Sequence, residues 1–174
     1  MPTRTDFTER DANRPRANRW APAVSCVLWW KGQIILQQRK DTEKWSLPGG
    51  TMEFGEGIHD TAIREIFEET GLIVTEIKRL VGIYSDPSHV IAYADGEIRQ
   101  EFAVVIEAEA QGEWRINDQE SLQIQAIDPG NIADVPMDTR HHQRLMDALH
   151  YQMAVIWNHS QPWIPLRENT DDQT

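Results

Sequence analysis

Six acidic residues and a single arginine lie within the 23 residues that run from Gly50 to Leu72. The acidic residues are Glu53, Glu56, Asp60, Glu65, Glu68 and Glu69, and the arginine is Arg64. Carboxylates on neighbouring turns of a helix repel one another, so a nearby cation would stabilise them. The spacing therefore indicates either a cation site or an acidic face in contact with water, which is the commoner explanation of such charge.

Three of these acids share one side of a predicted helix. At about 100° per residue, Glu65, Glu68 and Glu69 fall within an arc of about 100°, mostly away from the side centred on Ala62 and Ile66. We therefore expect the three carboxylates to face one point. Clustered carboxylate oxygens favour a hard divalent ion, Mg²⁺ first and Mn²⁺ as its substitute. A Mg²⁺ ion held in this way keeps positions for water and diphosphate oxygens, which predicts metal-assisted hydrolysis.

The spacing of the segment also resembles the signature of the Nudix hydrolase family. That signature reads Gly, five residues, Glu, seven residues, Arg-Glu, an aliphatic residue, any residue, Glu-Glu, any residue, Gly and an aliphatic residue. Every fixed position is matched, by Gly50, Glu56, Arg64, Glu65, Ile66, Glu68, Glu69, Gly71 and Leu72. At average residue usage the chance of such a match is on the order of one in ten million per chain.

The resemblance implies a fold and a reaction. The fold is α/β, a Nudix-type α/β/α sandwich with a mixed sheet and a loop-helix-loop catalytic element. The reaction is Mg²⁺-dependent cleavage of the diphosphate bond of a nucleoside diphosphate linked to another moiety. The implied metal ligands are Glu65, Glu68, Glu69 and the carbonyl of Gly50, and Glu65 also orients or deprotonates the attacking water.

The resemblance gives further residues a role. Arg64 and Glu56 resemble the ion pair that supports the helix and aims Glu65. In many family members another acid from a later loop completes the site, and Glu120 lies at about the right place for it. The alternative is that Glu120 is a loop residue exposed to solvent. Glu101 and Glu107 are weaker candidates for the additional acid.

The substrate is less well defined by the sequence. Pro87 lies 15 residues after Leu72, a spacing that resembles the ADP-ribose pyrophosphatase subgroup. ADP-ribose or a nucleotide sugar is therefore our first expectation, with Trp29, Arg39 and Pro87 as candidate substrate contacts. The alternatives are a pyrophosphatase that removes unwanted nucleoside triphosphates and a nucleotide-sensing module without turnover. We interpret His141 and His142 as structural, because a helical doublet points its rings about 100° apart.

Periodicity and turn residues predict the elements that carry these residues. We expect a strand over 23–30 with its hairpin partner over 33–39, a helix over 58–70 that ends at Gly71, further strands over 72–84, 98–108 and 121–127, and a second helix over 138–157. The domain prediction is a flexible N-terminal arm over 1–18, a Nudix hydrolase domain over 19–160 and a tail over 161–174.

Composition excludes several other classes of protein. Seventeen Lys and Arg against 28 Asp and Glu give a net charge of −11, which argues against binding duplex nucleic acid or an anionic membrane. Cys26 is the only cysteine, so neither a disulfide scaffold nor a thiolate zinc site fits. We expect a cytoplasmic enzyme with a small nucleotide as its partner, and a homodimer is left open.

Overall fold

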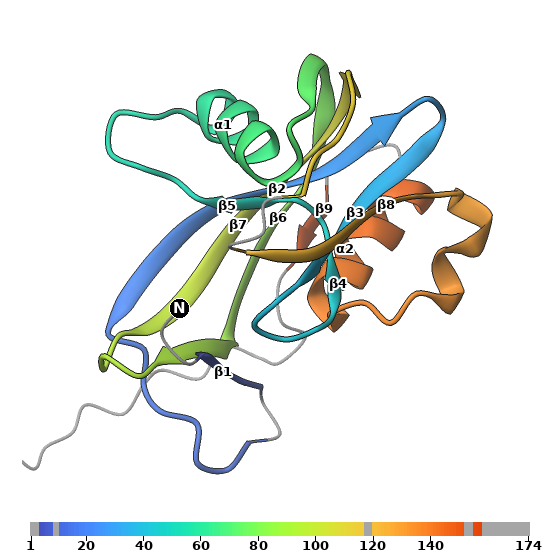
Figure 1. The fold of residues 1–174 in the computed structure, drawn as a ribbon. Coiled ribbons are helices and arrows are strands. Elements are labelled where there is room, and N and C mark those ends of the chain that lie inside the picture. The colour runs from blue at the N-terminus through green and yellow to red at the C-terminus, as the bar shows by residue number, and fades with distance from the viewer. Residues whose placement is uncertain (1–3, 9–10, 117–119, 152–154, 158–174) are drawn as a thin grey trace, which may run out of the picture.

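A mixed β-sheet with helices on both faces forms the body of the protein (Figure 1). The computed structural model describes residues 4–8, 11–116, 120–151 and 155–157. The strands in these residues are β1 (Arg4–Phe7), β2 (Arg19–Trp30), β3 (Gln33–Arg39), β4 (Trp45–Ser46), β5 (Gly49–Thr51), β6 (Ile73–Tyr93), β7 (Ile98–Gln111), β8 (Ser121–Ile127) and β9 (Val155–Trp157). The helices are α1 (Ile58–Thr70), the short 3₁₀ helix η1 (Pro129–Asp134) and α2 (Thr139–His150).

The strands follow the order β1-β6-β7-β2-β3-β4, and β5, β8 and β9 pair with β2, β3 and β6. The long strands β2 and β7 run parallel, whereas β2 and β3 form an antiparallel hairpin across Lys31 and Gly32. The parallel pairing brings residues about 80 positions apart side by side, such as Ala21 beside Glu101.

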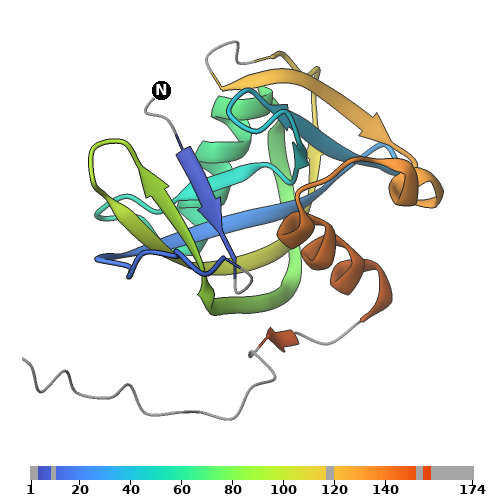
Figure 2. The same cartoon turned by 90° about the horizontal axis from the view of Figure 1, so that it is seen from below.

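Alternating side chains of β2 supply two separate cores. Val24, Cys26 and Leu28 point to the side covered by α1, where they pack with Ile66. The intervening Val27 belongs to the opposite core, together with Leu145 of α2 and residues of β3 and β7. Figure 2 shows α2 on the face of the sheet remote from α1. The expected α/β/α sandwich is therefore confirmed, and it follows from the two-residue period of a strand that is buried on both faces.

Helix α1 has the bounds that the sequence predicts. Its first turn is closed by Asp60, whose carboxylate accepts a hydrogen bond from the Gly57 amide at 2.9 Å. It ends at Gly71, which adopts a left-handed conformation with φ of 72°. A Cβ in that conformation is strained, which explains the glycine. The predicted strands over 33–39 and 121–127 are confirmed with the same bounds.

The chain ends of the domain differ from the prediction. Residues 4–7 lie in the segment expected to be a flexible arm, yet they form β1 and pair with residues 90–93 of β6. The second helix ends at His150 instead of continuing to 157, and Ile156 belongs to β9. Val155 and Ile156 are β-branched residues that favour a strand, and β9 pairs parallel with β6. Met153, also assigned to that helix, and the predicted tail over 161–174 lie outside the described residues.

Strand β6 continues to Tyr93, beyond the expected end at Tyr84, with a break in register between Ser85 and Val90. No helix among the described residues is long and apolar enough to cross a membrane.

Candidate active site

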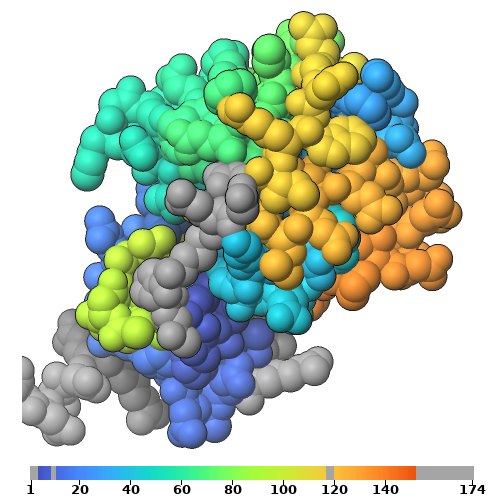
Figure 3. Space-filling model, in the orientation of Figure 1, coloured from blue at the N-terminus to red at the C-terminus, as the bar shows by residue number. Residues whose placement is uncertain are grey.

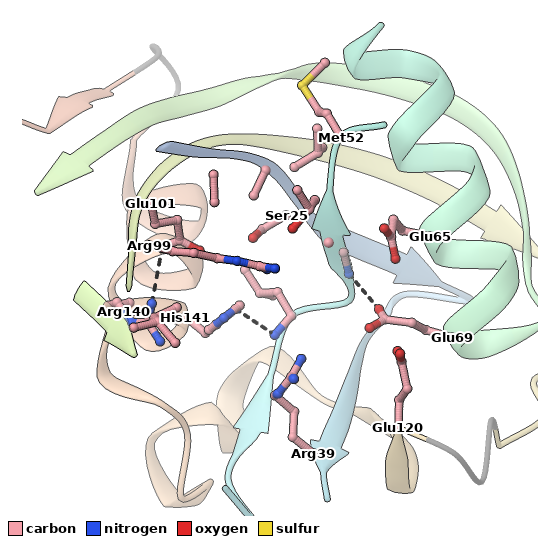
Figure 4. A pocket seen from close by; sticks show the side chains of 18 of the residues that line it. Ser25, Arg39, Met52, Glu65, Glu69, Arg99, Glu101, Glu120, Arg140 and His141 are labelled. Carbon is pink, nitrogen blue, oxygen red and sulfur yellow. Dashed lines mark hydrogen bonds and ion pairs between the residues drawn. The ribbon is translucent and has the colours of Figure 1, made fainter. Parts of the chain in front are cut away.

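A cavity of about 390 Å³ opens beside the first half of β2 (Figure 4). Its walls come from β1, β2, β5, α1, the hairpin of β6 and β7, and the first turn of α2. Figure 3 shows the surface around it, where the N-terminal strand in dark blue lies beside the β6–β7 hairpin in lime green. The small side chains of Ala21, Ala23 and Ser25 alternate along β2 and leave room for the cavity.

One wall of the cavity carries Glu65, Glu69 and Glu120. Glu65 and Glu69 are one helical turn apart on α1, and Glu120 comes from the segment just before β8 (Figure 4). Glu69 is only 2% exposed, and its Oε2 accepts a hydrogen bond from the Gly49 amide at 2.7 Å. The acids singled out in the sequence on α1 and at Glu120 are thus brought together, except for Glu68.

Gly50 allows β5 to approach these carboxylates closely. A Cβ at position 50 would lie 2.4 Å from the Oε1 atom of Glu65. Any other residue would therefore displace the Glu65 carboxylate, which explains the glycine at this position. The close approach also places the backbone of β5 next to the acidic wall, as expected for a carbonyl that assists in holding a cation.

The negative charges of this wall are only partly compensated by Arg64 and Arg39. Burial raises the pKa of Glu69 to about 8, and the nearby Glu65 carboxylate adds to the rise, although Gln37 and the Gly49 amide oppose it. Burial also raises the pKa of Glu65, against the opposing effect of Arg64 and with repulsion from Glu68 and Glu120. Buried carboxylates in this state favour either a proton or a cation.

The donor set fits a hard divalent ion. Carboxylate oxygens of Glu65, Glu69 and Glu120 and the backbone carbonyl of Gly50 are oxygen ligands of the type that Mg²⁺ and Mn²⁺ prefer. These residues would hold the ion, and its charge would offset the repulsion that raises the two pKa values. In the described part of the chain, no three His, Cys, Asp or Glu side chains are arranged as a ready metal site.

Glu68 explains this difference from the expected triad. Its side chain is 56% exposed, it does not line the cavity, and its carboxylate lies 3.4 Å from Nη1 of Arg64. Glu65, Glu68 and Glu69 share one side of the helix as predicted, but the Glu68 carboxylate does not join the other two at the cavity. Arg64, one turn earlier, lies within ion-pair distance of this largely exposed side chain.

Arg64 joins α1 to the loop that precedes it. Its Nε and Nη2 atoms donate to the two carboxylate oxygens of Glu56, at 2.6 and 2.9 Å. Its Nη1 donates to Oε1 of Glu65 at 2.8 Å. Hydrogen bonds from Arg64 are the largest cause that lowers the pKa of Glu56 to about 2. The pair therefore fixes the Glu65 carboxylate from behind, as a planar guanidinium bound at two oxygens does.

The opposite wall of the cavity is polar and was mostly missed by sequence reasoning. It carries Ser25, Arg99, Glu101, Arg140 and His141, gathered from β2, β7 and α2 (Figure 4). The sequence predicts a structural role for His141, but the structure places this residue in the lining of the cavity. Glu101, the weaker candidate for the additional acid, lines it too, but on the side away from Glu65. These residues form no motif, and the alternation of small residues in β2 is the one signal of a cavity here.

The three candidate substrate contacts have different positions. Arg39 lines the cavity, and both oxygens of Asp41 accept hydrogen bonds from it, at 2.8 and 2.7 Å. Trp29 does not line it; its indole N–H donates to Glu107 at 2.8 Å, and its ring packs against the core on the α2 side. Pro87 is exposed and lies outside the cavity. Arg39 is therefore the candidate that the structure brings to the site.

The family of the chain follows from comparison with known proteins. A family model described as the NUDIX domain matches residues 19–149. The chain belongs to the Nudix family. This confirms the resemblance found in the signature, and the chain is accordingly a Nudix hydrolase with pyrophosphohydrolase relatives.

Individual relatives cover the Nudix domain to different extents. A Bacillus subtilis protein named uncharacterized Nudix hydrolase YvcI is 28% identical over 114 residues, which cover 66% of this chain and 70% of that relative. An ADP-ribose pyrophosphatase of Methanocaldococcus jannaschii is 40% identical over 80 residues, which cover 41% of this chain and less than half, 47%, of that relative. The crystal structure of a MutT protein from Bacillus halodurans superposes with a TM-score of 0.64 at 26% identity and covers 78% of this chain and 86% of that structure.

Proposed function

We propose that this Nudix hydrolase cleaves the diphosphate bond of a nucleoside diphosphate linked to another moiety, with Mg²⁺ as its cofactor and Mn²⁺ as a substitute. The observation that carries the proposal is the arrangement of Glu65, Glu69 and Glu120 on one wall of a cavity large enough for a nucleotide. Cavities of about 300 to 1,000 Å³ are typical of small-molecule sites. The NUDIX domain match supports the same reaction class.

The geometry supports the following roles. Glu65, Glu69, Glu120 and the Gly50 carbonyl would hold the cation, with Glu68 recruited from its pair with Arg64 as a further ligand. When bound, the ion neutralises charge on the diphosphate oxygens and polarises water. Glu65 is the group we assign to orienting the attacking water, because Arg64 fixes its carboxylate and burial makes it a stronger base.

The reaction itself is a hydrolysis. The water oxygen forms a bond to one phosphorus atom, the bridging P–O bond breaks, and the leaving phosphate takes the electron pair. The water proton passes to a carboxylate of the acidic wall before release to solvent. Arg39 at the edge of the cavity is positioned to contact a phosphate. Burial lowers the pKa of Arg39, whereas Asp41 and, more weakly, the nearby Glu69 and Glu120 raise it. Arg39 therefore lies close to the acidic wall.

Two classes of substrate are considered: ADP-ribose or nucleotide sugars, and nucleoside triphosphates. ADP-ribose and nucleotide sugars remain the first expectation from the sequence, and an ADP-ribose pyrophosphatase among the relatives supports it. Pro87, however, does not line the cavity, so a substrate contact no longer supports this preference. The nucleoside triphosphates are therefore included on equal terms in the test.

The test is a hydrolysis panel with metal control. The protein is incubated with Mg²⁺ and ADP-ribose, UDP-glucose or each nucleoside triphosphate, and release of monophosphate, diphosphate or phosphate is measured. We expect at least one substrate to be cleaved, and we expect excess EDTA to abolish the cleavage. Binding without any release would overturn the enzymatic proposal in favour of a sensing module. Location in the cytoplasm, the absence of nucleic-acid partners and homodimer formation stay predictions.

A further inference from the structure

Three side chains on the polar wall have hydrogen-bonding roles that their neighbours fix. Ser25, Glu101 and His141 line the cavity on the side opposite Glu65 and Glu69 (Figure 4). Each contacts a group that can only donate a hydrogen bond. Their remaining donor or acceptor capacity can therefore be deduced, and it describes the part of the substrate that the wall fits.

The His141 ring accepts one hydrogen bond at Nδ1 and offers a donor at Nε2. Its Nδ1 atom lies 3.2 Å from the Leu47 amide, which can only donate, so Nδ1 must be the acceptor. Burial, with the positive charge of Arg144, lowers the pKa of His141 to about 3, and the ring is neutral. A neutral ring that accepts at Nδ1 carries its proton on Nε2. Among the described residues, no oxygen accepts that Nε2 hydrogen.

Ser25 is a second donor by the same reasoning. Its Oγ atom lies 3.2 Å from Nη1 of Arg144, and a guanidinium has donors but no acceptor. The serine oxygen therefore accepts, and its own hydrogen points elsewhere. Within the part of the chain that the structure describes, no group accepts this hydrogen. Ser25 is only 5% exposed and lines the cavity, so a group bound in the cavity can accept this hydrogen.

Glu101 is the acceptor of the wall. Its Oε2 atom accepts hydrogen bonds from Nη2 of Arg144 at 2.5 Å and from Nη1 of Arg140 at 3.3 Å. Although burial acts in the opposite direction, these two arginines keep the pKa of Glu101 well below its usual range. The residue is therefore a carboxylate. Its other oxygen, Oε1, has no donor among the described residues and is available to accept.

The arginines of this wall are already paired with acids. Arg140 lies within 4 Å of carboxylate oxygens of Glu101, Asp138 and Asp6. Arg99 is held by Glu97 at 2.5 Å, and Arg144 by Glu101. These ion pairs neutralise most of the positive charge of the wall, so little of it remains to attract a phosphate. The wall is therefore suited to a neutral polar group.

We propose that Ser25, His141 and Glu101 recognise the lactam edge of a nucleobase, a carbonyl next to a ring N–H, as in guanine, hypoxanthine and uracil. The carbonyl oxygen has two lone pairs and accepts from Ser25 and His141, while the ring N–H donates to Glu101. At the same positions adenine and cytosine carry an exocyclic amino group, which donates, and an unprotonated ring nitrogen, which accepts. The donors of Ser25 and His141 would then face another donor, and the Glu101 carboxylate would face a lone pair. Leaving a buried donor unpaired is unfavourable.

The proposal deepens the proposed function and rests on it only for the phosphate end of the substrate. It specifies the base: a guanine, hypoxanthine or uracil nucleotide is preferred to the corresponding adenine or cytosine nucleotide. Among the substrate classes considered above, it favours triphosphates or nucleotide sugars of these bases over ADP-ribose.

The kinetic test compares bases at constant phosphate chemistry. With Mg²⁺ present, kcat/KM is measured for GTP, UTP, ATP, CTP and the base-free ribose 5-triphosphate. We expect GTP and UTP to exceed ATP and CTP by at least about tenfold, the discrimination typical of one well-placed pair of hydrogen bonds. Equal values for all four nucleotides would overturn the proposal.

Variants separate recognition from a structural role. In His141→Asn, the side-chain oxygen can still accept from the Leu47 amide, but the donor at the Nε2 position is removed. We expect the ratio of GTP to ATP to fall to within about threefold, mainly through KM, with ribose 5-triphosphate unaffected. Ser25→Ala tests the second donor in the same way. The control is His142→Asn, on the same turn but outside the cavity, which should leave the ratio unchanged.

A binding measurement separates failure of this proposal from failure of the proposed function. Affinities for GMP and AMP are measured calorimetrically in EDTA, where no hydrolysis takes place. Preference for GMP that His141→Asn removes supports base recognition even if no substrate is ever cleaved. Equal affinity for GMP and AMP, or uniform loss of all substrates in the variant, would overturn it even if hydrolysis is found.

Discussion

The two walls of the cavity are built in opposite ways. The acidic wall comes mostly from one continuous segment, because Glu65 and Glu69 lie one turn apart on α1. The polar wall comes from distant segments: Arg144 bonds Ser25 across 119 positions and Glu101 across 43. The pKa values of Glu65 and Glu69 on the acidic wall are raised although Arg64 pairs with Glu65, whereas the acids and arginines of the polar wall are paired with one another.

This difference separates chemistry from recognition. A wall with an excess of carboxylates is arranged for a cation, and helix geometry fixes Glu65 and Glu69 relative to one another. A wall with internally paired charge offers directed hydrogen bonds without net attraction for anions. Substitutions on the acidic wall should therefore reduce turnover of every substrate, while substitutions on the polar wall should change the choice among substrates.

The largest effect is expected from Glu69→Gln. The amide keeps the volume of the side chain and an oxygen for the Gly49 amide, but it removes a negative charge from the acidic wall. We expect kcat to fall by at least about 100-fold for every substrate, comparable to the loss of a major charge-stabilising group. The melting temperature should change little. Steady-state kinetics and thermal denaturation check both, and wild-type activity in the variant would contradict the assignment of the cation site.

Gly50→Ala should have the next largest effect. The new Cβ would meet the Glu65 carboxylate at 2.4 Å, and the end of that flexible side chain can move away at small cost in stability. We expect kcat/KM to fall about tenfold to 100-fold, because a displaced ligand or base is no longer held in productive geometry.

Gly130→Ala is the matched control for this substitution. A Cβ at position 130 would meet nothing within 4 Å, so activity should stay at the wild-type level. If the two alanine variants are equally active, the close approach of β5 to Glu65 does not matter for the reaction.

A smaller effect is expected on the pH dependence of stability. Burial raises the pKa of Glu69 in the folded, metal-free protein to about 8 from an ordinary value of 4.5. The folded state therefore favours the protonated form, and this contribution to the free energy of unfolding is fully present below pH 4.5 and is lost as the pH rises through about 8. In EDTA, the melting temperature of the wild type should decrease between pH 5 and pH 8.5 more steeply than that of Glu69→Gln.

Magnesium provides the counterpart to this measurement. At pH 8.5 the Glu69 carboxylate is ionised, and Mg²⁺ should raise the melting temperature of the wild type by binding the folded state. The same addition should have less effect on Glu69→Gln. Parallel pH curves for the two proteins in EDTA would show that Glu69 does not carry the raised pKa.

The smallest effect is expected from Trp29→Phe. The substitution removes the hydrogen bond to Glu107 and keeps an aromatic ring in the core on the α2 side. The free energy of unfolding should decrease by about 1 kcal/mol, as for a typical hydrogen bond, measured by urea denaturation. KM should be unchanged, since Trp29 does not line the cavity. An increased KM with unchanged stability would restore Trp29 as a substrate contact.

The same difference between the walls explains how far the sequence could predict the structure. Helix α1 could be predicted to the residue because its apolar period, its closing Gly71 and its acids are all local signals. Glu68 could not be placed, because helical spacing defines the side of the helix but not the rotamer that leaves this side chain exposed beside Arg64. Glu101, Ser25 and Arg144 could not be connected, because their proximity depends on the parallel pairing of β2 with β7 and on where α2 packs.

The chain ends were difficult for a related reason. Apolar spacing predicted a helix through Ile156, but pairing with β6 is a tertiary interaction that overrides a weak helical pattern. The N-terminal residues have few apolar side chains, and their strand is held by backbone pairing to β6 and by ion pairs such as Arg4 with Asp41. Such contacts have no periodic signature in the sequence.

Strand β1 has a practical consequence for anyone who transplants or trims this domain. The NUDIX match begins at residue 19, yet Arg4 lines the cavity and β1 forms the outer edge of the sheet. A fragment cut at the family boundary would keep the whole catalytic signature and lose part of the rim of its own cavity. Residues outside the stretch that matches the family model therefore belong to the lining of the cavity.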